Sequence, residues 1–183
     1  MHADNARKNF FRPGGDHLTL LAVFEQWKEA EYSHNWCFEN FLQVRSMKRA
    51  RDVKEQLIEL CKRVELDYAD EALSIVDEDA YTNVRKAICS GFFYNTAKLK
   101  NSGDYRTMKN SQTIDIHPSS CLYEIKPKTV VYHELVSTAK EYMRQIIEIE
   151  PEWLLEIAPH YYKPIDIIDP EKKKPKKKMP KMR

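Results

Sequence analysis

Apolar residues in the first half of the chain recur at intervals of three and four, which is the period of a helix that buries one side. Leu20, Leu21, Phe24 and Trp27 follow this spacing, and Asp16 stands where a capping side chain is preferred. The pattern therefore predicts an amphipathic helix that begins near Asp16. A second, shorter helical piece is expected to carry the next apolar cluster, which consists of Trp36, Phe38, Phe41 and Leu42.

The longest helical pattern comes next, with Ser46 as its predicted cap and a charged face opposite its apolar stripe. The stripe comprises Met47, Ala50, Val53, Leu57, Leu60, Cys61 and Val64. Residues 66–79 are then acidic and weakly patterned, which predicts a loop. Their carboxylates lack the alternating acidic positions around a glycine that a calcium loop requires, so they indicate solvation and not metal binding.

A fourth helix is predicted to end near Leu99. Its shared face comprises Tyr81, Val84, Ile88, Gly91, Phe92 and Asn95. A glycine inside an exposed helix costs about 1 kcal/mol relative to alanine. We therefore expect a close helix crossing or backbone approach at Gly91 to compensate.

Beyond residue 101 the apolar period shortens to about 2, which is typical of strands. Strands are predicted at residues 105–108, 112–117, 129–136 and 141–149, with turns at 109–111 and 118–120. Residues 151–157 predict a last short helix with Pro151 at its first position. Helices followed by short strands indicate an α+β chain. By periodicity alone, a generic α+β domain fits as well as a small barrel.

The composition is that of a soluble folded protein, with 42% apolar residues in a chain of 183. No stretch approaches the roughly 18 apolar residues that a membrane helix needs, and no signal peptide is present. We therefore expect neither secretion nor a membrane partner. The cysteines at positions 37, 61, 89 and 121 form no CxxC pair, which favours buried free thiols over a zinc site or a disulfide framework.

The net charge of +2 conceals an asymmetry. Residues 170–183 contain seven lysines, one arginine and one glutamate, a local charge of +7, which leaves −5 for the rest of the chain. Any nucleic-acid surface on the body must therefore come from local clusters of cations. The basic tail is predicted to be disordered, and it is typical of a nuclear import signal or an electrostatic anchor for RNA, with a solvated flexible end as the alternative.

Four cations lie close together at the start of the long helix: Arg45, Lys48, Arg49 and Arg51. Cations at this end oppose the helix dipole, which favours a phosphate or another acidic partner over a purely structural role. The alternative is a solvated face stabilised by pairs at a spacing of four residues. The pairs that this alternative predicts are Arg51 with Glu55 and Lys48 with Asp52.

Longer segments carry a family resemblance: FFRPGGDHLTLLAVFEQW from Phe10 to Trp27 and NWCFENFLQVRSMKRARDV from Asn35 to Val53. They resemble the helicase-associated C-terminal region of DEAH-box ATP-dependent RNA helicases. With HADNARKNFF (residues 2–11) and APHYYK (residues 158–163), the sequence most resembles the spliceosomal member of this family that acts in pre-mRNA splicing just before its first step. The resemblance covers residues 4–163.

The resemblance implies a fragment of a longer helicase whose ATPase motor precedes it, with Met1 as an added start. It divides the chain into a helical bundle segment that ends the helicase-associated domain (1–101), a small β-barrel of the oligonucleotide/oligosaccharide-binding type, or OB fold (102–165), and a disordered Lys-rich tail (166–183). No phosphate-binding GxxxxGK[ST] loop, DEAH tetrad, GxSxG or HExxH occurs. We expect no catalytic or metal-binding residue in this chain, whereas ATP and Mg²⁺ would belong to the motor domains of the parent enzyme.

In an OB fold the loops between strands take the ligand, so the resemblance adds RNA-binding candidates there. These are Tyr105, Arg106, Lys109, His117, Ser119 and Ser120, the last three within the family-like segment IHPSS. Arg106 or Lys109 could pair with phosphate, the serine hydroxyls could bond phosphate oxygens, and the rings could stack on a base. The alternatives are strand packing for Tyr105 and Tyr132 and a turn-supporting role for His117. The aromatic residues at 92–94 and 161–162 are expected to pack between the helices and the barrel.

The expected function is that of a nuclear accessory region that binds single-stranded RNA of the pre-mRNA, completes the RNA channel and couples the motor to strand translocation. Phosphate contacts of this kind are tolerant of sequence and sensitive to salt. The alternative is a protein-interaction module that docks a splicing cofactor, such as a glycine-rich G-patch protein, or another spliceosomal protein.

Overall fold

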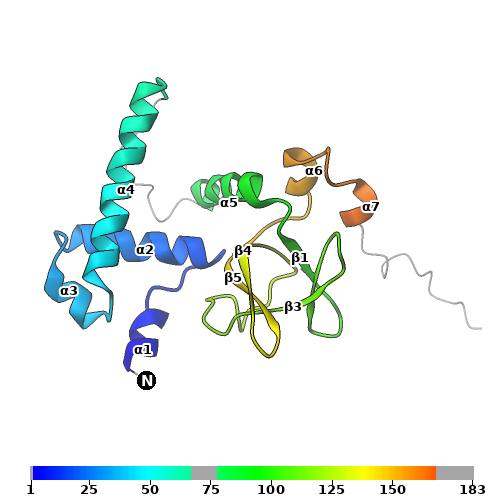
Figure 1. Cartoon of the computed structure of the whole chain (residues 1–183), viewed down its shortest axis with the longest axis horizontal. Coiled ribbons are helices and arrows are strands. Elements are labelled where there is room, and N and C mark those ends of the chain that lie inside the picture. The colour runs from blue at the N-terminus through cyan, green and yellow to red at the C-terminus, as the bar shows by residue number, and fades with distance from the viewer. Residues whose placement is uncertain (1, 67–77, 168–183) are drawn as a thin grey trace, which may run out of the picture.

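The computed structural model describes residues 2–66 and 78–167. Most of the predicted acidic loop and the basic tail from residue 168 onward lie outside the described residues. Helices fill the first half of the chain, a β-barrel follows, and two short helices close the described part (Figure 1). The α+β class predicted from the hydrophobic period is confirmed.

Five helices precede the barrel: α1 (His2–Lys8), α2 (Asp16–Glu29), α3 (His34–Glu39), α4 (Val44–Arg63) and α5 (Glu78–Phe92). The sequence predicted all of them except α1. Trp27, at the end of the apolar pattern in α2, is fully buried as its spacing indicates. None of the helices in residues 2–66 and 78–167 is long and apolar enough to cross a membrane.

The start and the buried face of α2 differ from the prediction. Gly15 occupies the capping position and no side chain caps the helix, whereas Asp16 is its first residue and turns its carboxylate toward the barrel. Leu20 is 55% exposed, because the face that packs against the barrel is shifted by about half a turn. The buried side chains of α2 are Leu18, Thr19, Ala22, Val23 and Trp27.

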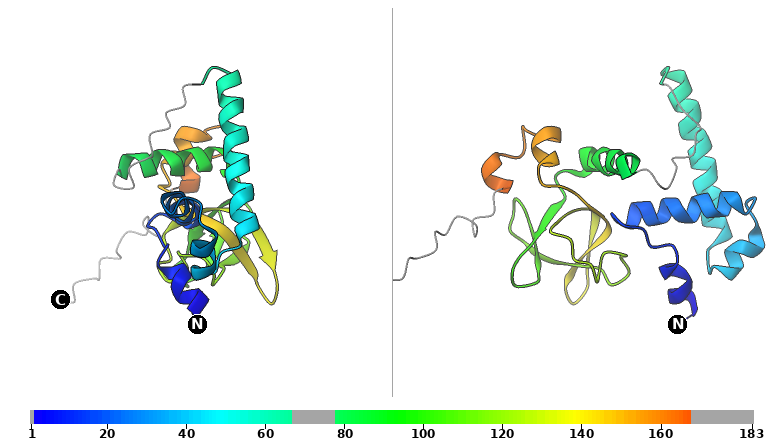
Figure 2. Two further views of the ribbon diagram at one scale, coloured as in Figure 1. Left: turned by 90° about the vertical axis from the view of Figure 1, so that its left-hand side faces the viewer. Right: turned by 180° about the vertical axis from the view of Figure 1, so that it is seen from behind.

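The long helix α4 begins earlier than predicted and stays at the surface. Ser46 is not its cap, because the helix starts at Val44 and the Ser46 hydroxyl instead donates to the side-chain oxygen of Gln43 at 2.7 Å. No residue of α4 is buried. Figures 1 and 2 show α4 crossing α2 near its own start and then rising away from the barrel.

The barrel contains the strands β1 (Thr96–Leu99), β2 (Tyr105–Thr107), β3 (Thr113–Ile116), β4 (Thr129–Ser137) and β5 (Glu141–Glu148). They close in the order β1-β2-β3-β5-β4. All neighbouring pairs are antiparallel except β3 with β5, and β1 completes the ring by pairing with both β2 and β4. This closed ring is the small barrel that the family resemblance implied, and it excludes an open α+β sheet.

The sequence missed β1. The fourth helix ends at Phe92 and not near Leu99, because Thr96–Leu99 is already the first strand of the barrel. The barrel therefore begins inside the range 1–101 that was assigned to helices. At the other end, Asp166 and Ile167 belong to a short helix, α7 (Pro164–Ile167), rather than to the tail that was predicted to start at residue 166.

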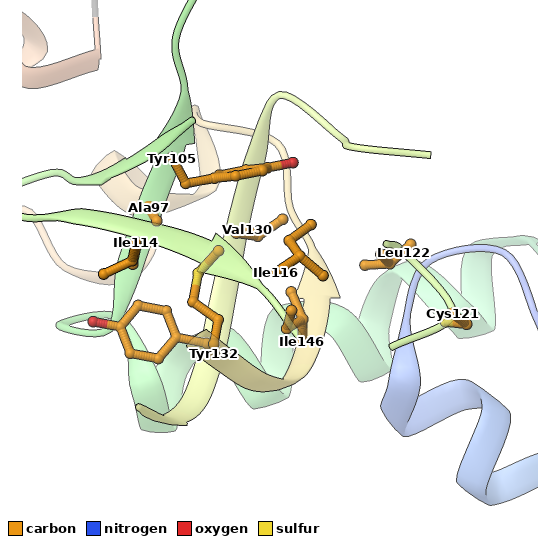
Figure 3. Packing of buried hydrophobic residues seen from close by; sticks show 10 residues of the cluster. Ala97, Tyr105, Ile114, Ile116, Cys121, Leu122, Val130, Tyr132 and Ile146 are labelled. Atoms are coloured by element: carbon orange, nitrogen blue, oxygen red, sulfur yellow. The ribbon is translucent and has the colours of Figure 1, made fainter. Parts of the chain in front are cut away.

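The barrel interior holds the main hydrophobic core. Alternate residues of β3 and β4 point inward, as the two-residue period predicts, and Figure 3 shows them meeting between the strands. Strand β5 instead contributes Met143 and Ile146, which are three residues apart. Fully buried side chains of this cluster include Tyr105, Ile114, Val130, Met143 and Ile146. Burial of each such aliphatic side chain contributes about 1.5–3 kcal/mol.

A second core lies on the outside of the barrel. Val131 points away from the interior and is covered by Cys89 of α5, Leu154 of α6 (Trp153–Ile157) and Tyr162. Figures 1 and 2 show α5 and α6 together on this side of the barrel. Because both faces of β4 are covered here, its run Thr129–Tyr132 is buried at every position.

Gly91 near the end of α5 has no close neighbour. A Cβ built at this position would meet nothing within 4 Å, so the expected helix crossing or backbone approach is absent there. The predicted role of Pro151 is also wrong, because Pro151 lies in a turn and α6 begins at Trp153. All four cysteines are free, and burial raises the pKa of the Cys121 thiol to about 12.

Candidate nucleic-acid interface

A polar pocket opens at one end of the barrel, where three connecting segments meet. They are the β1–β2 connection (residues 100–104), residues 123–126 of the β3–β4 connection and the β4–β5 turn (residues 138–140), with β3 as the floor. The pocket has a volume of about 320 Å³. The side chains that define it are Asp104, Asp115, Tyr123, Lys126, Lys140 and Tyr142.

Short turns fix the rim of this pocket. In the β1–β2 connection, Gly103 has a φ of +90° and its N–H donates to the Lys100 carbonyl at 2.9 Å. Such a backbone conformation favours glycine, which explains the residue at this turn. In the β4–β5 turn the N–H of Thr138 donates to the carbonyl of Lys140 at 2.9 Å, which positions the Lys140 side chain at the rim.

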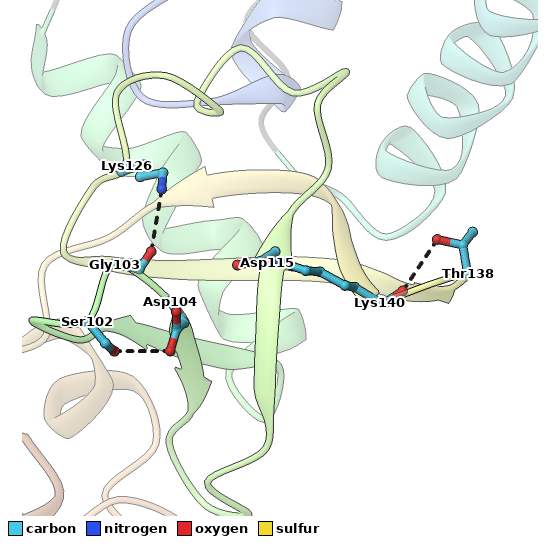
Figure 4. Close-up of polar contacts among 7 residues, drawn as sticks. All are labelled: Ser102, Gly103, Asp104, Asp115, Lys126, Thr138 and Lys140. Carbon is cyan, nitrogen blue, oxygen red and sulfur yellow. Dashed lines mark hydrogen bonds and ion pairs between the residues drawn. The ribbon is translucent and has the colours of Figure 1, made fainter.

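Each charged side chain at the rim already has an internal partner (Figure 4). The Lys140 ammonium lies 2.9 Å from the Asp115 carboxylate, and this hydrogen bond raises the pKa of Lys140. Lys126 donates to the Gly103 carbonyl at 3.4 Å, and Asp104 accepts from Ser102 at 3.0 Å. Because two lysines face two aspartates, their charges balance, and Asp115 competes with a phosphate group for the Lys140 ammonium.

Two aromatic rings border the same pocket. Tyr123 is 42% exposed, so a face of its ring is open to solvent. Tyr142 is half-buried, and its ring meets the His117 ring edge-on with 5.7 Å between the centroids. Aromatic rings next to cations are the arrangement on which single-stranded nucleic acids stack their bases.

The loop beside this pocket, which contains the segment IHPSS (residues 116–120), is held by internal hydrogen bonds. The Ser119 N–H donates to Nδ1 of His117 at 3.1 Å, and the Ser119 hydroxyl lies 2.7 Å from the same nitrogen. The Ser119 carbonyl accepts from Arg7. Ser120 is buried and its hydroxyl donates to Asp16 at 2.9 Å. Ser120 therefore does not present its hydroxyl to solvent, and its phosphate contact stays a prediction. The bond from Ser119 to His117 is of the kind that the turn-supporting alternative expects.

The three candidates on β2 and its following turn have different surroundings. Tyr105 is 1% exposed and its hydroxyl donates to the Pro127 carbonyl at 2.5 Å, so its ring has no face to offer a base. Arg106 is exposed beside Lys98 of β1. Lys109 forms an ion pair with Asp166 at 2.8 Å and lies over the rings of Tyr161 and Tyr162, at 5.3 and 5.2 Å from their centroids. Lys109 thus fastens α7 to the barrel.

Part of the predicted cation cluster on α4 is exposed. Arg45, Lys48 and Arg49 line an open groove of about 630 Å³ between α3 and α4. None of the three makes an ion pair within residues 2–66 and 78–167, so the predicted Lys48–Asp52 pair is absent. Three exposed cations along one groove suit the phosphates of an extended strand.

Arg51 does not join this groove. Its guanidinium lies 3.4 Å from Asp52 and 3.9 Å from Glu55, the pair that the alternative interpretation predicted. The same group sits over the Tyr32 ring at 5.6 Å. Arg51 therefore links α4 to the residues after α2, and its predicted RNA contact stays a prediction.

The sequence did not single out the pocket side chains Tyr123, Lys126, Lys140 and Tyr142. Tyr123, Lys126 and Lys140 lie on connections between strands and Tyr142 lies near the start of β5, so that only the folded barrel brings them together. One signal was available, because the predicted strands 129–136 and 141–149 leave a short gap in which Lys140 stands. The aromatic residues at 92–94 and 161–162 mostly pack as expected, although Tyr94 is 52% exposed.

In the parts of the chain that the structure describes, no group of three histidine, cysteine or acidic side chains could hold a metal ion. Residues 84–161 match the model of a family described as an oligonucleotide/oligosaccharide-binding (OB) fold. The matched range begins within α5, includes all five strands and α6, and ends in the turn that follows α6. The barrel is therefore an OB fold, and the match supports a helicase-associated region.

Proposed function

We propose that this chain is the C-terminal accessory region of a DEAH-box ATP-dependent RNA helicase that acts in pre-mRNA splicing in the nucleus. In this role it forms part of the wall of the single-stranded RNA channel and couples movement of the motor to movement of the strand. The match of residues 84–161 to the OB-fold family supports the accessory role, because this domain type is found at the C-terminus of DEAH/RHA helicases.

The barrel-end pocket is the observation that carries the RNA-binding part of the proposal. It lies between the β1–β2 and β4–β5 connections, the two loops with which OB folds bind oligonucleotides. Tyr123 and Tyr142 provide ring faces for bases, while Lys126 and Lys140 provide cations for phosphates. Because these contacts use ring faces and charges rather than base edges, they suit a strand of any sequence.

The groove on α4 supplies a second set of phosphate contacts through Arg45, Lys48 and Arg49. No residue lines both this groove and the barrel-end pocket. An extended strand that touched both would span the helical half and the barrel. This arrangement suits a channel wall better than a closed ligand site.

The connection between α2 and the barrel suits the coupling role. The Asp16 carboxylate accepts from Cys121 N–H and Ile146 N–H, each at 2.9 Å. The Gly14 carbonyl also accepts from Glu148 N–H at 2.8 Å. These backbone bonds join the helical half to β5, so that a displacement of α2 would carry the barrel with it.

An NMR titration of the 183-residue chain with a single-stranded oligouridine tests the proposal, because it detects binding even at millimolar affinity. We expect backbone amide shifts at the barrel-end pocket and along the start of α4. If all five cations of the two regions meet phosphates, affinity should fall roughly 100-fold between about 50 and about 200 mM salt.

Variants assign the two regions. Tyr123→Ala should remove the shifts at the pocket, and the triple change of Arg45, Lys48 and Arg49 to Gln should remove those on α4. Lys8→Gln, an exposed cation outside both regions, should change neither. The same triple variant and Tyr123→Ala should slow ATP-driven unwinding when placed in the parent helicase. No amide shift at either region, together with wild-type unwinding by both variants, would refute the proposed function.

A further inference from the structure

One residue in the middle of β5 has a backbone conformation that is foreign to strands. Gln145 has a φ of +51°, in the left-handed region, although strand residues precede and follow it. A residue with a side chain adopts this conformation at a cost in free energy, and the conformation persists only where surrounding contacts fix it. The structure around Gln145 must therefore contain the contacts that fix it.

The left-handed residue changes which side chains of β5 face the barrel interior. Successive residues of a regular strand point to opposite sides, so Gln145 would point inward together with Met143. Instead, Met143 and Ile146 are both fully buried in the barrel core, while Arg144 and Gln145 are exposed. Figure 3 shows Ile146 among the interior side chains. Gln145 thus shifts the alternation by one residue, so that each half of β5 places an apolar side chain in the core.

The backbone of β5 changes phase at the same point. The Met143 carbonyl accepts from the His117 N–H at 3.0 Å, so this carbonyl lies at the edge of β5 that faces away from β4. In a regular strand the next N–H groups at that edge would belong to residues 145 and 147, because every second residue turns the same way. The donors found there belong instead to Ile146 and Glu148.

The start of α2 supplies the acceptors for these two donors. The Ile146 N–H donates to the Asp16 carboxylate at 2.9 Å, and the Glu148 N–H donates to the Gly14 carbonyl at 2.8 Å. Both bonds require that the second half of β5 turn its donors toward α2, and the left-handed Gln145 supplies this change of phase. Asp16 therefore fixes the unusual conformation of the residue that precedes its donor.

The position of Tyr142 depends on this change of phase. Because Tyr142 precedes the buried Met143, its ring points to the outer side of β5, where it borders the barrel-end pocket. Asp115, its partner in the register with β3, borders the same pocket. If β5 alternated regularly back from the positions that α2 fixes, Met143 would face outward and Tyr142 would face the interior. The conformation of Gln145 thus determines on which side of β5 Tyr142 lies.

We propose that Asp16 and Gln145 are positioning residues for RNA binding. Asp16 holds β5 in the conformation with a left-handed Gln145, and this conformation presents the Tyr142 ring to RNA in the barrel-end pocket. The proposal rests on the RNA-binding function proposed above for this pocket. Neither Asp16 nor Gln145 lines the pocket, so both act through β5. RNA affinity at the pocket is thereby linked to the attachment of α2.

Two substitutions at Gln145 with opposite backbone preferences test the proposal. The 183-residue chain and its variants are titrated with an oligouridine, and the dissociation constant is taken from the amide shift of Tyr123 at the pocket. Gln145→Gly keeps the left-handed conformation without its strain, so it should bind like the wild type and raise the midpoint of thermal unfolding by about 2 °C. Gln145→Val disfavours a positive φ and should weaken binding by about fivefold or more, because a stacking ring is lost.

A second background separates positioning from a general effect on the protein. Tyr142→Leu removes the ring, and in this background Gln145→Val should cause no further loss of affinity. Asp16→Asn should also weaken binding, and again only while Tyr142 is present. In Gln145→Val without RNA, the nuclear Overhauser contact between the rings of Tyr142 and His117 should disappear. His133→Val places valine at an exposed position of β4 and should leave the affinity unchanged.

Each result decides between the proposals. If the wild type binds and Gln145→Val binds equally well, or loses the same factor with and without the Tyr142 ring, positioning is refuted while the RNA-binding function stands. If the wild type shows no shifts at the pocket, the RNA site itself is refuted and this proposal with it. A lower unfolding midpoint of Gln145→Gly would also overturn the proposal. If circular dichroism shows Gln145→Val to be unfolded, the comparison of Asp16→Asn with and without Tyr142 decides in its place.

Discussion

The backbone N–H of Ile146 donates to the carboxylate of Asp16 at 2.9 Å, across 130 positions of sequence. The same carboxylate accepts from the Ser120 hydroxyl and the Cys121 N–H, each also at 2.9 Å. One side chain at the start of α2 therefore accepts hydrogen bonds from the β3–β4 connection and from β5. Two of the donors are backbone groups that few other side chains could reach.

Replacing Asp16 by Ala should lower the free energy of unfolding by about 2–4 kcal/mol, because three hydrogen-bond donors would lose their acceptor in a part-buried position. Asn, which keeps one acceptor oxygen, should lose less than Ala. Urea denaturation followed by tryptophan fluorescence measures both. Asp52→Asn, on the exposed face of α4, is the control and should change the free energy of unfolding by less than about 0.5 kcal/mol. Equal stability of the Asp16 and Asp52 variants would contradict this account.

Two glycines should respond in opposite ways to alanine. Gly15 has a φ of +139°, and an added Cβ would lie 2.7 Å from the Cα of Ile147, so Gly15→Ala should destabilise the protein by about 2 kcal/mol or more. Gly91 lies in the exposed part of α5 with open space around it, so Gly91→Ala should stabilise by about 0.5–1 kcal/mol. Thermal unfolding of the two variants beside the wild type gives the sign of each change. A loss of stability in Gly91→Ala would mean that the helix end needs glycine for another reason.

Asp115 should weaken RNA binding at the barrel-end pocket, because its carboxylate holds the Lys140 ammonium at 2.9 Å. Asp115→Asn would release Lys140 and raise the local charge, which should tighten binding of a single-stranded oligonucleotide by roughly threefold at low salt. Lys140→Gln should weaken it, and the double variant should resemble Lys140→Gln. The salt slope of affinity checks the explanation, since it should steepen only in Asp115→Asn. An unchanged slope in that variant would show that Lys140 does not meet phosphate.

Attachment of α7 to the barrel should depend on pH through Asp166. The hydrogen bond from Lys109 and that from the Lys163 N–H hold the pKa of Asp166 below its usual value. The carboxylate therefore contributes stability that is fully present above the usual aspartate pKa of about 3.9 and is lost as the pH falls through the lowered value. Amide hydrogen exchange in α7 should speed up in strong acid relative to the rest of the barrel. Lys109→Gln should flatten that pH dependence, and an unchanged profile in this variant would reject the assignment.

The extent of sequence-based prediction differed between elements for physical reasons. Strands β2 to β5 were found within about two residues, because a two-residue apolar period and the turn residues between them mark them in the sequence. Strand β1 was missed because Thr96–Leu99 follows α5 after only three residues, so the helical pattern was extended through it to Leu99. The position of Asp16 suggested a local cap, whereas its acceptors serve donors more than a hundred residues away, which no local pattern reveals.

The candidate site was predicted only in part for similar reasons. Arg45, Lys48 and Arg49 were recognised because a cluster of cations on one helix is visible in the sequence and stays exposed in the structure. Tyr105 and Ser120 were named as candidates although both are buried, since residue type indicates what a side chain can bind but not whether it is buried. The pocket side chains Tyr123 and Lys126 come from the β3–β4 connection, Lys140 from the β4–β5 turn and Tyr142 from β5, and their proximity depends on the closure of the barrel.

Closure of the barrel by β1 also determines how the protein tolerates cleavage. Strand β1 pairs on one side with β2 and on the other with β4, so its loss would expose two strand edges at once. One of these edges would be the Thr129–Tyr132 stretch of β4, which is buried on both faces and rich in β-branched side chains. An unpaired apolar edge of this kind templates association between chains. Proteolysis between Thr96 and Leu99 would therefore convert the closed barrel into a species prone to aggregation, whereas a cut before α5 would leave the ring closed.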